Sequence, residues 1–254
     1  MRKNIKERAA QGLCSYGLNI ALSDPVTVLM AARAGFDFVR IDCEHMMFSD
    51  EVIKNMIYIA RGLDLPIQLR VADLNKASAL LDLGASGLMV PHTSSREKAE
   101  EAVMATKYAP YGQRGMTGSS RALNFGEFKL NDYASWANDD VSLIVQIEDK
   151  AGLEHIDEIL SVPGIDMVAT GKNDLAQALG VPGQNNHPDV IAAEDMVIRK
   201  ALEHGKYPTL MVKSTKRIAE LYEKGVRCFS LGRDESLLFG AMKDNLAALK
   251  LEEK

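Results

Sequence analysis

Short apolar segments alternate with amphipathic segments from one end of the chain to the other. The apolar segments are four to seven residues long and rich in β-branched side chains, which is typical of buried strands. The predicted strands cover residues 14–20, 36–41, 67–71, 87–91, 142–147, 167–170, 209–212 and 228–231.

The segments between these strands repeat apolar residues at helical spacing. In residues 50–61, for example, Ile53, Met56 and Ile57 fall on one face of a helix. The predicted helices cover residues 50–61, 76–83, 95–108, 154–160, 188–204, 215–224 and 235–250. Strands that alternate with helices in this way favour an α/β fold, the eight-stranded (β/α)8 or TIM barrel.

An open, doubly wound sheet is the alternative, but no Gly-x-Gly-x-x-Gly motif follows an early strand. No linker or low-complexity stretch divides the chain, so we expect residues 1–254 to form one barrel domain. The least regular part is residues 108–140, where a long loop is expected to serve as a lid or an interface. Its segment 114–121 is rich in Gly and Ser, and its backbone amides could hold an anion.

Composition narrows the classes of function. The 254 residues are 46% hydrophobic and carry a net charge of −5 without a basic run, which argues against nucleic acid and anionic membranes as partners. Three widely spaced cysteines fit free thiols in a reducing compartment. We find no signal-peptide pattern and no apolar run of about 18 residues, and therefore expect a cytoplasmic protein.

Polar residues follow several of the predicted strands. They are Asp42, Glu44 and His45 after the second strand, Arg70 at the end of the third, Glu148 and Asp149 after the fifth, and Gly171, Lys172, Asn173 and Asp174 after the sixth. In a barrel these strand ends meet at one face, where active sites are built. The sequence therefore predicts a site that contains carboxylates, an arginine and a histidine.

Glu148 and Asp174 are the natural pair for a hard cation, since Mg²⁺ and Mn²⁺ prefer oxygen ligands and keep positions open for water and substrate. The structural alternative is that each carboxylate braces a loop, with Asp174 as a helix N-cap. Arg70 has two readings as well: its guanidinium either holds an oxyanion or forms a salt bridge with a neighbouring strand end. Asp42 and His45 suit an acid–base dyad in which the carboxylate orients the imidazole. His92, after the fourth strand, is a further candidate.

Taken in order, these residues resemble the HpcH/HpaI family of class II pyruvate aldolases. The similar stretches are residues 31–45 with Asp-x-Glu-His, 67–70, 84–91, 108–115, 145–148 and 171–180 with Gly-x-x-Asp-Leu-Ala. The resemblance extends from about residue 12 to residue 247.

The resemblance implies an aldehyde-lyase that needs a divalent cation, Mg²⁺, Mn²⁺ or Co²⁺, held by Glu148 and Asp174. Its small-molecule substrates would be a 2-oxo acid, pyruvate, and an aldehyde, joined into or released from a 4-hydroxy-2-oxo acid through the pyruvate enolate. Arg70 would stabilise the enolate oxygen, and Asp42 and His45 would move protons directly or through a water molecule. Gly171, Lys172, Asn173 and Asp174 would surround the substrate, with backbone amides near Gly171 and Asp174 receiving the pyruvate carboxylate.

The chain departs from the family pattern at several positions. Relatives commonly have glycine at the position of Cys43 and proline at that of Lys172; Lys172 would add positive charge to the site if it points inward. His92 replaces a residue that is usually apolar, and Arg121 matches a family arginine only with a one-residue insertion. The roles of Lys172, His92 and Arg121 therefore stay open.

The sequence leaves two alternative functions open, and the resemblance also bears on the oligomeric state. Some barrels of this family resemble citrate-forming condensing enzymes, in which an acyl thioester reacts with oxaloacetate, and a non-catalytic metabolite-binding barrel is the third reading. Family members also resemble hexamers, often with an exchanged C-terminal helix. The resemblance therefore implies a homohexamer. Residues 235–250 carry an apolar face that could pack on their own barrel or on a neighbour, and the sequence does not choose between the two.

Overall fold

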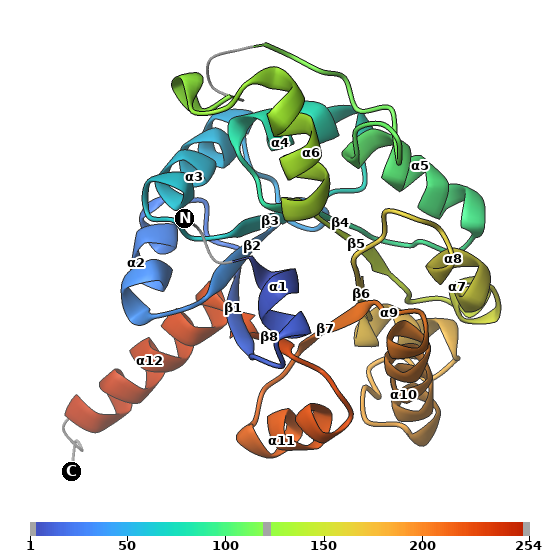
Figure 1. The fold of residues 1–254 in the computed structure, drawn as a ribbon. Coiled ribbons are helices and arrows are strands. Elements are labelled where there is room, and N and C mark those ends of the chain that lie inside the picture. Colours follow the sequence, from blue (N-terminus) through green and yellow to red (C-terminus); the bar gives the residue numbers. More distant parts are fainter. Residues whose placement is uncertain (1–3, 119–122, 251–254) are drawn as a thin grey trace.

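Eight parallel strands form a closed barrel in the computed structural model, which describes residues 4–118 and 123–250 (Figure 1). The strands are β1 (Ser15–Ile20), β2 (Phe38–Asp42), β3 (Ile67–Arg70), β4 (Gly87–Val90), β5 (Ser142–Gln146), β6 (Met167–Ala169), β7 (Tyr207–Met211) and β8 (Cys228–Arg233). Each pairs with the next, and β8 pairs with β1. The predicted (β/α)8 barrel is confirmed.

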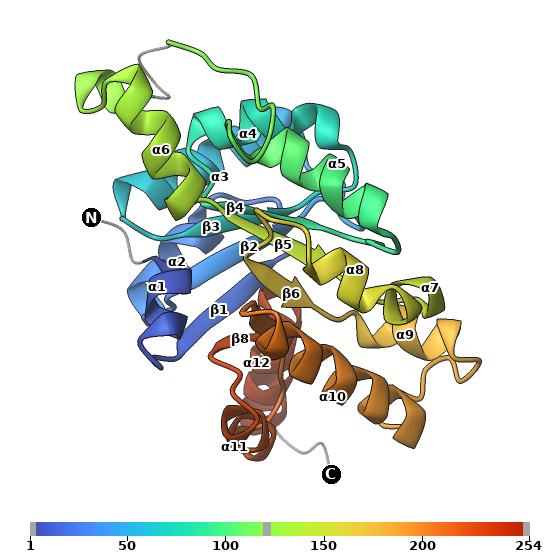
Figure 2. The same ribbon diagram turned by 45° about the vertical axis from the view of Figure 1, so that its right-hand side comes forward.

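Most helices surround the barrel on its outer side, whereas the first helix lies over one end of the barrel (Figures 1 and 2). The α-helices are α1 (Ile5–Ala10), α2 (Val26–Ala34), α3 (Asp50–Gly62), α4 (Ala77–Leu83), α5 (Arg96–Thr106), α6 (Leu130–Asp140), α7 (Lys150–Glu154), α8 (Ile156–Leu160), α9 (Lys172–Ala178), α10 (Pro188–Glu203), α11 (Thr215–Glu223) and α12 (Asp234–Leu249), with 3₁₀ turns at Leu74–Lys76 and Asn124–Gly126. No helix in the described ranges is long and apolar enough to cross a membrane.

The segment expected to be irregular, residues 108–140, contains a full helix, α6. Tyr133 and Ala137 are buried in the core cluster that contains Leu69 and Leu88, and the ring of Phe128 stacks on Trp136 and meets Tyr133 edge-on. Aromatic contacts of α6 with Tyr108 and Phe128, which precede it in the chain, thus add to its packing. The predicted helix 154–160 is also corrected, because it breaks at His155 into α7 and α8.

Alternation along the strands divides the side chains between two environments. Outward residues such as Ile41, Leu69 and Leu88 are fully buried beneath the helices and form the core. Inward residues are polar near the carboxyl ends, and the register places Arg40 opposite Gln68. The barrel interior is therefore apolar lower down and polar where it opens.

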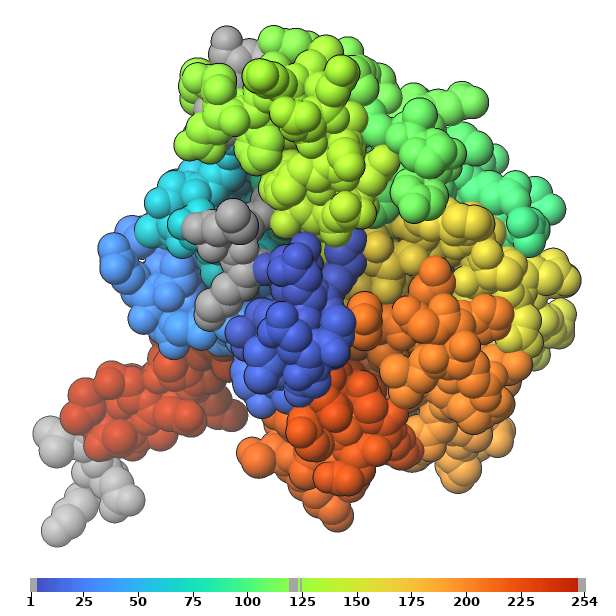
Figure 3. All heavy atoms as spheres, in the orientation of Figure 1, coloured from blue at the N-terminus to red at the C-terminus, as the bar shows by residue number. Residues whose placement is uncertain are grey.

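Helix α12 leaves the barrel and extends away from it, as the red helix in Figures 1 and 3 shows. Its start is tied to β1, because the Asp234 carboxylate accepts the backbone N–H of Ala21 at 2.8 Å. Beyond that anchor its large apolar side chains are exposed, at 44% for Leu238 and 73% for Leu249. Such a helix face is normally covered in a folded protein.

Candidate active site

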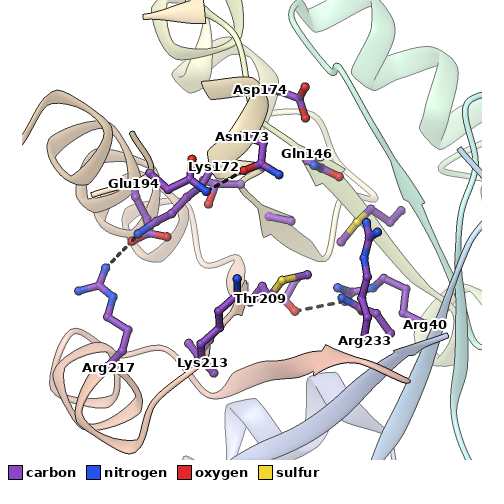
Figure 4. A pocket seen from close by; sticks show the side chains of 18 of the residues that line it. Arg40, Gln146, Lys172, Asn173, Asp174, Glu194, Thr209, Lys213, Arg217 and Arg233 are labelled. Carbon is purple, nitrogen blue, oxygen red and sulfur yellow. Dashed lines mark hydrogen bonds and ion pairs between the residues drawn. The ribbon is translucent and has the colours of Figure 1, made fainter. Parts of the chain in front are cut away.

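A cavity of about 740 Å³ opens at the carboxyl ends of the strands (Figure 4). Its walls include seven residues that the sequence singled out: Asp42, His45, Arg70, Gly171, Lys172, Asn173 and Asp174. They come from β2 and its following loop, from β3, and from the β6–α9 junction. The structure thus brings the polar strand ends together in one place, as a barrel requires.

Glu148 lies directly behind this wall and is 1% exposed. One carboxylate oxygen, Oε1, accepts the backbone N–H of His92 at 2.9 Å, and the other accepts the side-chain amide of Gln146. Burial raises the pKa of Glu148 above its usual range against the opposing effect of His92, and the nearby charge of Asp174 raises it further. Two carboxylates that repel each other in this way form a site suited to a cation.

Asp174 lies in the first turn of α9, but it does not cap that helix, whose N-cap is Gly171. In the described part of the chain the Asp174 carboxylate has no hydrogen-bond or ion-pair partner, so the N-cap alternative loses its support. The buried oxygens Gln146 Oε1 and Thr170 Oγ1 also lack partners. Carboxylate and neutral oxygens of this kind fit Mg²⁺ or Mn²⁺.

Gly171 is required at its position by space rather than by backbone conformation. A Cβ atom there would lie 2.1 Å from Glu148 Oε2 and 2.6 Å from Gln146 Nε2. The backbone is extended, with φ of −105°, so other residues could adopt it. The missing side chain therefore lets the Glu148 carboxylate reach the cavity wall. Among the described residues no group of three or more His, Cys, Asp or Glu side chains forms a metal site, so a cation here would have two carboxylates and open positions.

Arg70 holds Asp42 through both ends of its fork. Nε lies 2.9 Å from Asp42 Oδ1 and Nη2 lies 2.6 Å from Oδ2, while Nη1 lies 3.2 Å from Glu44 Oε2. Burial raises the pKa of Asp42, but the hydrogen bonds and charge of Arg70 outweigh it and leave the pKa below its usual range. Arg70 thus forms the salt bridge that was one of its two predicted roles. The same contacts fix the position of its guanidinium at the cavity wall.

The predicted dyad of Asp42 and His45 is not formed between their side chains. Asp42 accepts the backbone N–H of His45 at 3.3 Å, whereas the His45 ring lies 3.7 Å from Glu44 Oε2. The bidentate contact with Arg70 explains this correction, because the guanidinium occupies both oxygens of the Asp42 carboxylate. His45 still lines the cavity, with its side chain 49% exposed.

Glu44, a strand-end residue without a predicted role, and His92, a further candidate, are both connected to Glu148. The His92 ring bridges two carboxylates, with Nε2 3.1 Å from Glu44 Oε1 and Nδ1 3.3 Å from Glu148 Oε1. Its φ of +49° places it in the left-handed region, which favours glycine. The Asp-x-Glu-His motif contained Glu44, but nothing in the sequence indicated that His92 would connect it to Glu148.

Lys172 and Asn173 line the far wall of the cavity (Figure 4). The Lys172 ammonium lies 3.0 Å from Glu194 Oε2, which also binds Arg217, so its charge is directed to Glu194 rather than to Glu148 and Asp174. The side-chain amide of Asn185 donates to Asn173 Oδ1 at 2.7 Å. These contacts connect the polar side chains of this wall to one another.

The segment 114–121, whose backbone amides could hold an anion, lies partly outside the described residues, and at its described start the Arg114 side chain anchors the fold. Arg114 is buried, forms an ion pair of 2.5 Å with Asp82 and lies over the ring of Tyr108 at 4.6 Å. Its side chain is therefore committed to packing. Arg121 lies outside the described residues.

Comparison with known proteins gives a consistent result. Residues 15–241 match the family model described as HpcH/HpaI aldolase/citrate lyase. The 2-keto-3-deoxy-L-rhamnonate aldolase of Escherichia coli (strain K12) is 31% identical over 249 residues, which cover 96% of this chain and 92% of that protein.

Solved structures include relatives with more than one activity in their descriptions. An HpcH/HpaI aldolase from Desulfitobacterium hafniense DCB-2 superposes with a TM-score of 0.92 at 29% identity, covering 98% of this chain and 97% of that one. The citrate synthase SbnG superposes with a TM-score of 0.88 at 31% identity, covering 96% of each chain.

Proposed function

Since the chain belongs to the HpcH/HpaI aldolase/citrate lyase family, it is a carbon–carbon lyase, and we propose that it cleaves and forms 4-hydroxy-2-oxo acids through the enolate of pyruvate. The observation that carries this proposal is the pair of Glu148 and Asp174 beside Gly171. One carboxylate is buried and held, and the other has no protein partner among the described residues.

The proposed cofactor is a divalent cation, Mg²⁺, Mn²⁺ or Co²⁺, bound by Glu148 and Asp174. When bound, such a cation withdraws electron density from a 2-oxo group and so makes loss of a neighbouring proton easier. The unpartnered oxygens of Gln146 and Thr170 support a site that prefers oxygen ligands.

The chain itself supplies charge stabilisation and proton transfer. The guanidinium of Arg70, whose orientation Asp42 fixes, is placed to stabilise negative charge on the 2-oxo oxygen. His45, at the cavity wall, is the candidate that accepts and returns the proton, and Asp42 positions both groups through Arg70 and the His45 backbone. Gly171, Lys172, Asn173 and Asp174 are proposed to surround the substrate.

The test is release of pyruvate from a 4-hydroxy-2-oxo acid, followed with and without Mg²⁺. Glu148→Gln keeps the shape of the side chain but removes its charge. We therefore expect turnover to fall, and metal affinity to fall by more than the roughly 10–100-fold that is typical when a residue next to a metal ligand is changed. Glu220→Gln, at the rim of the same cavity, is the matched control and should behave as wild type. Equal metal affinity in both variants would remove Glu148 from the site.

The second candidate is a citrate-synthase-like condensation of an acyl thioester with oxaloacetate. The likeness to the citrate synthase SbnG, at 31% identity, favours keeping it. Dependence of product formation on a thioester, without release of pyruvate from hydroxy-oxo acids, would select this activity.

We also propose that the enzyme is a homohexamer whose subunits exchange α12. The support is that α12 projects from the rest of the molecule (Figure 3) and that its large apolar side chains are exposed, so a second copy of the chain would cover them. As the active unit we propose one domain of residues 1–254 acting in the cytoplasm, where free thiols such as those of Cys14, Cys43 and Cys228 are stable. Cell fractionation tests the location.

A further inference from the structure

Arg40 is a buried cation in the barrel interior that faces the cavity. It is 8% exposed, projects inward from β2 one layer below Asp42, and forms part of the cavity lining. Figure 4 places its guanidinium at the cavity wall opposite Lys172 and Asn173. The ring of Phe38 lies 5.5 Å away from it on the apolar side of the barrel.

The partners of Arg40 are all neutral. Nε and Nη2 both donate to Gln68 Oε1, at 3.2 and 2.8 Å, Nη2 also donates to Thr209 Oγ1 at 3.2 Å, and Nη1 donates to Ser230 Oγ at 3.3 Å. Within the described ranges no carboxylate lies within 4.0 Å of this guanidinium, although buried charges are normally paired. Arg70 and Arg233, by contrast, both bind Asp42.

The cluster around Arg40 lacks an acceptor as well as a negative charge. The buried amide nitrogen of Gln68, Nε2, has no partner, because the oxygen of the same amide is turned to Arg40. The Cys228 thiol does not supply the missing charge: burial raises its pKa to about 11, so it is neutral near pH 7. Burial lowers the pKa of Arg40 only to about 10, which leaves it charged.

We propose that Arg40 anchors a carboxylate-binding site in the floor of the cavity, separate from the proposed cation site at Glu148 and Asp174. Of the five guanidinium N–H groups, four donate to Gln68, Thr209 and Ser230, and the remaining one on Nη1 is free to donate to a carboxylate, whose negative charge would balance that of the buried Arg40. Two sources share this chemistry: the non-reacting end of a 2-oxo acid substrate, or a free carboxylate. The first source rests on the proposed function, and the second does not.

The first arm measures binding to the Mg²⁺-loaded protein by calorimetry. 2-Oxoglutarate and 2-oxopentanoate have equal length and differ only in a terminal carboxylate, and 2-oxoadipate with 2-oxohexanoate forms a longer matched pair. For one of these pairs we expect wild type to bind the dianion about 10-fold or more tightly, as charge-assisted hydrogen bonds allow. Arg40→Met should reduce that preference to less than about 2-fold and leave pyruvate affinity unchanged.

A matched control and a stability measurement separate binding from folding. Lys216→Met removes a positive charge from the exposed rim of the same cavity and should keep the preference. Arg40→Met should melt at or above the wild-type temperature, since an unpaired buried charge is lost. If it does not fold, Arg40→Lys keeps the charge without the fork and should show an intermediate preference.

The second arm uses the metal-free protein and propionate, which has no 2-oxo group. Stabilisation of wild type but not of Arg40→Met against heating would support the site with a free carboxylate as its source. If neither dianions nor propionate distinguish the two proteins, and Arg40→Met melts well below wild type, Arg40 is structural and the proposal is overturned. Failure of pyruvate to bind the Mg²⁺-loaded wild type would instead contradict the proposed function and leave the propionate result standing.

Discussion

Gly171→Ala is the substitution whose effect the structure defines most closely. The added methyl group would lie 2.1 Å from Glu148 Oε2, whereas ordinary contacts of a Cβ atom are about 3.4–4 Å. The Glu148 carboxylate must therefore move by roughly 1 Å, and misplacement by this distance typically costs on the order of 100-fold in rate. Since Glu148 is buried and held by His92 and Gln146, overpacking should also cost about 1–3 kcal/mol of stability.

The assay combines Mn²⁺ titration with pyruvate release from a hydroxy-oxo acid. We expect weaker Mn²⁺ binding, turnover reduced about 100-fold, and a melting temperature lower by several degrees with the fold retained. Gly115→Ala is the matched control, because nothing lies within 4 Å of a Cβ atom there and its φ is not positive. Turnover of Gly171→Ala within about 3-fold of wild type would refute the placement of Glu148 at the reacting centre.

Three further predictions follow from the site and from α12. Arg70→Ala should reduce turnover by at least 10²–10³-fold, as loss of an oxyanion donor typically does, with the circular dichroism spectrum unchanged; near-wild-type turnover would remove Arg70 from the mechanism. Asp42→Asn should lower the free energy of unfolding by on the order of 3 kcal/mol near pH 7, measured by urea denaturation. Because Arg70 lowers the folded-state pKa of Asp42, this difference should persist above about pH 4 and narrow as the pH falls further; a constant difference would contradict the pairing. Leu246→Glu on the exposed face of α12 should reduce the mass measured by light scattering, while Lys243→Glu on the same helix should not; an unchanged mass in both would argue against exchange of α12.

Much of the barrel could be predicted from the sequence because burial imposes a clear pattern. The predicted strand 142–147 and the observed β5, Ser142–Gln146, differ by one residue, and α3 begins at the predicted Asp50 with Ser49 as its N-cap. Helix α6 was missed because only Tyr133 and Ala137 on it are buried, which leaves a weak helical period, and because its aromatic contacts with Tyr108 and Phe128 reach residues outside the helix.

The sequence also predicted several residues of the candidate site, but it did not predict which of their side chains bind each other. Strand ends located Asp42, Arg70, Glu148 and Asp174, because parallel strands in a barrel share one face. Which carboxylate meets which cation depends on register: Asp42 lies opposite Arg70 across β2 and β3, so the arginine, not His45, binds it. Such a register is set by packing between strands and cannot be read from either strand alone.

The position of Arg40 could also be predicted from the sequence, but its lack of a charged partner could not. Its position in an apolar run predicts a strand, and alternation places it inside the barrel. Only the assembled structure reveals that the residues around it, Gln68, Thr209 and Ser230, are neutral and leave its charge unpaired.

The measurement that tests the central claim most directly is exchange of the methyl hydrogens of pyruvate for deuterium in D2O, followed by NMR. It needs no knowledge of the aldehyde and reports enolate formation alone. The account predicts exchange that requires Mg²⁺ or Mn²⁺, stops with a chelator, and is lost in Glu148→Gln but kept in Glu220→Gln. Absence of exchange with every divalent cation tested would contradict it and favour the thioester-dependent condensation.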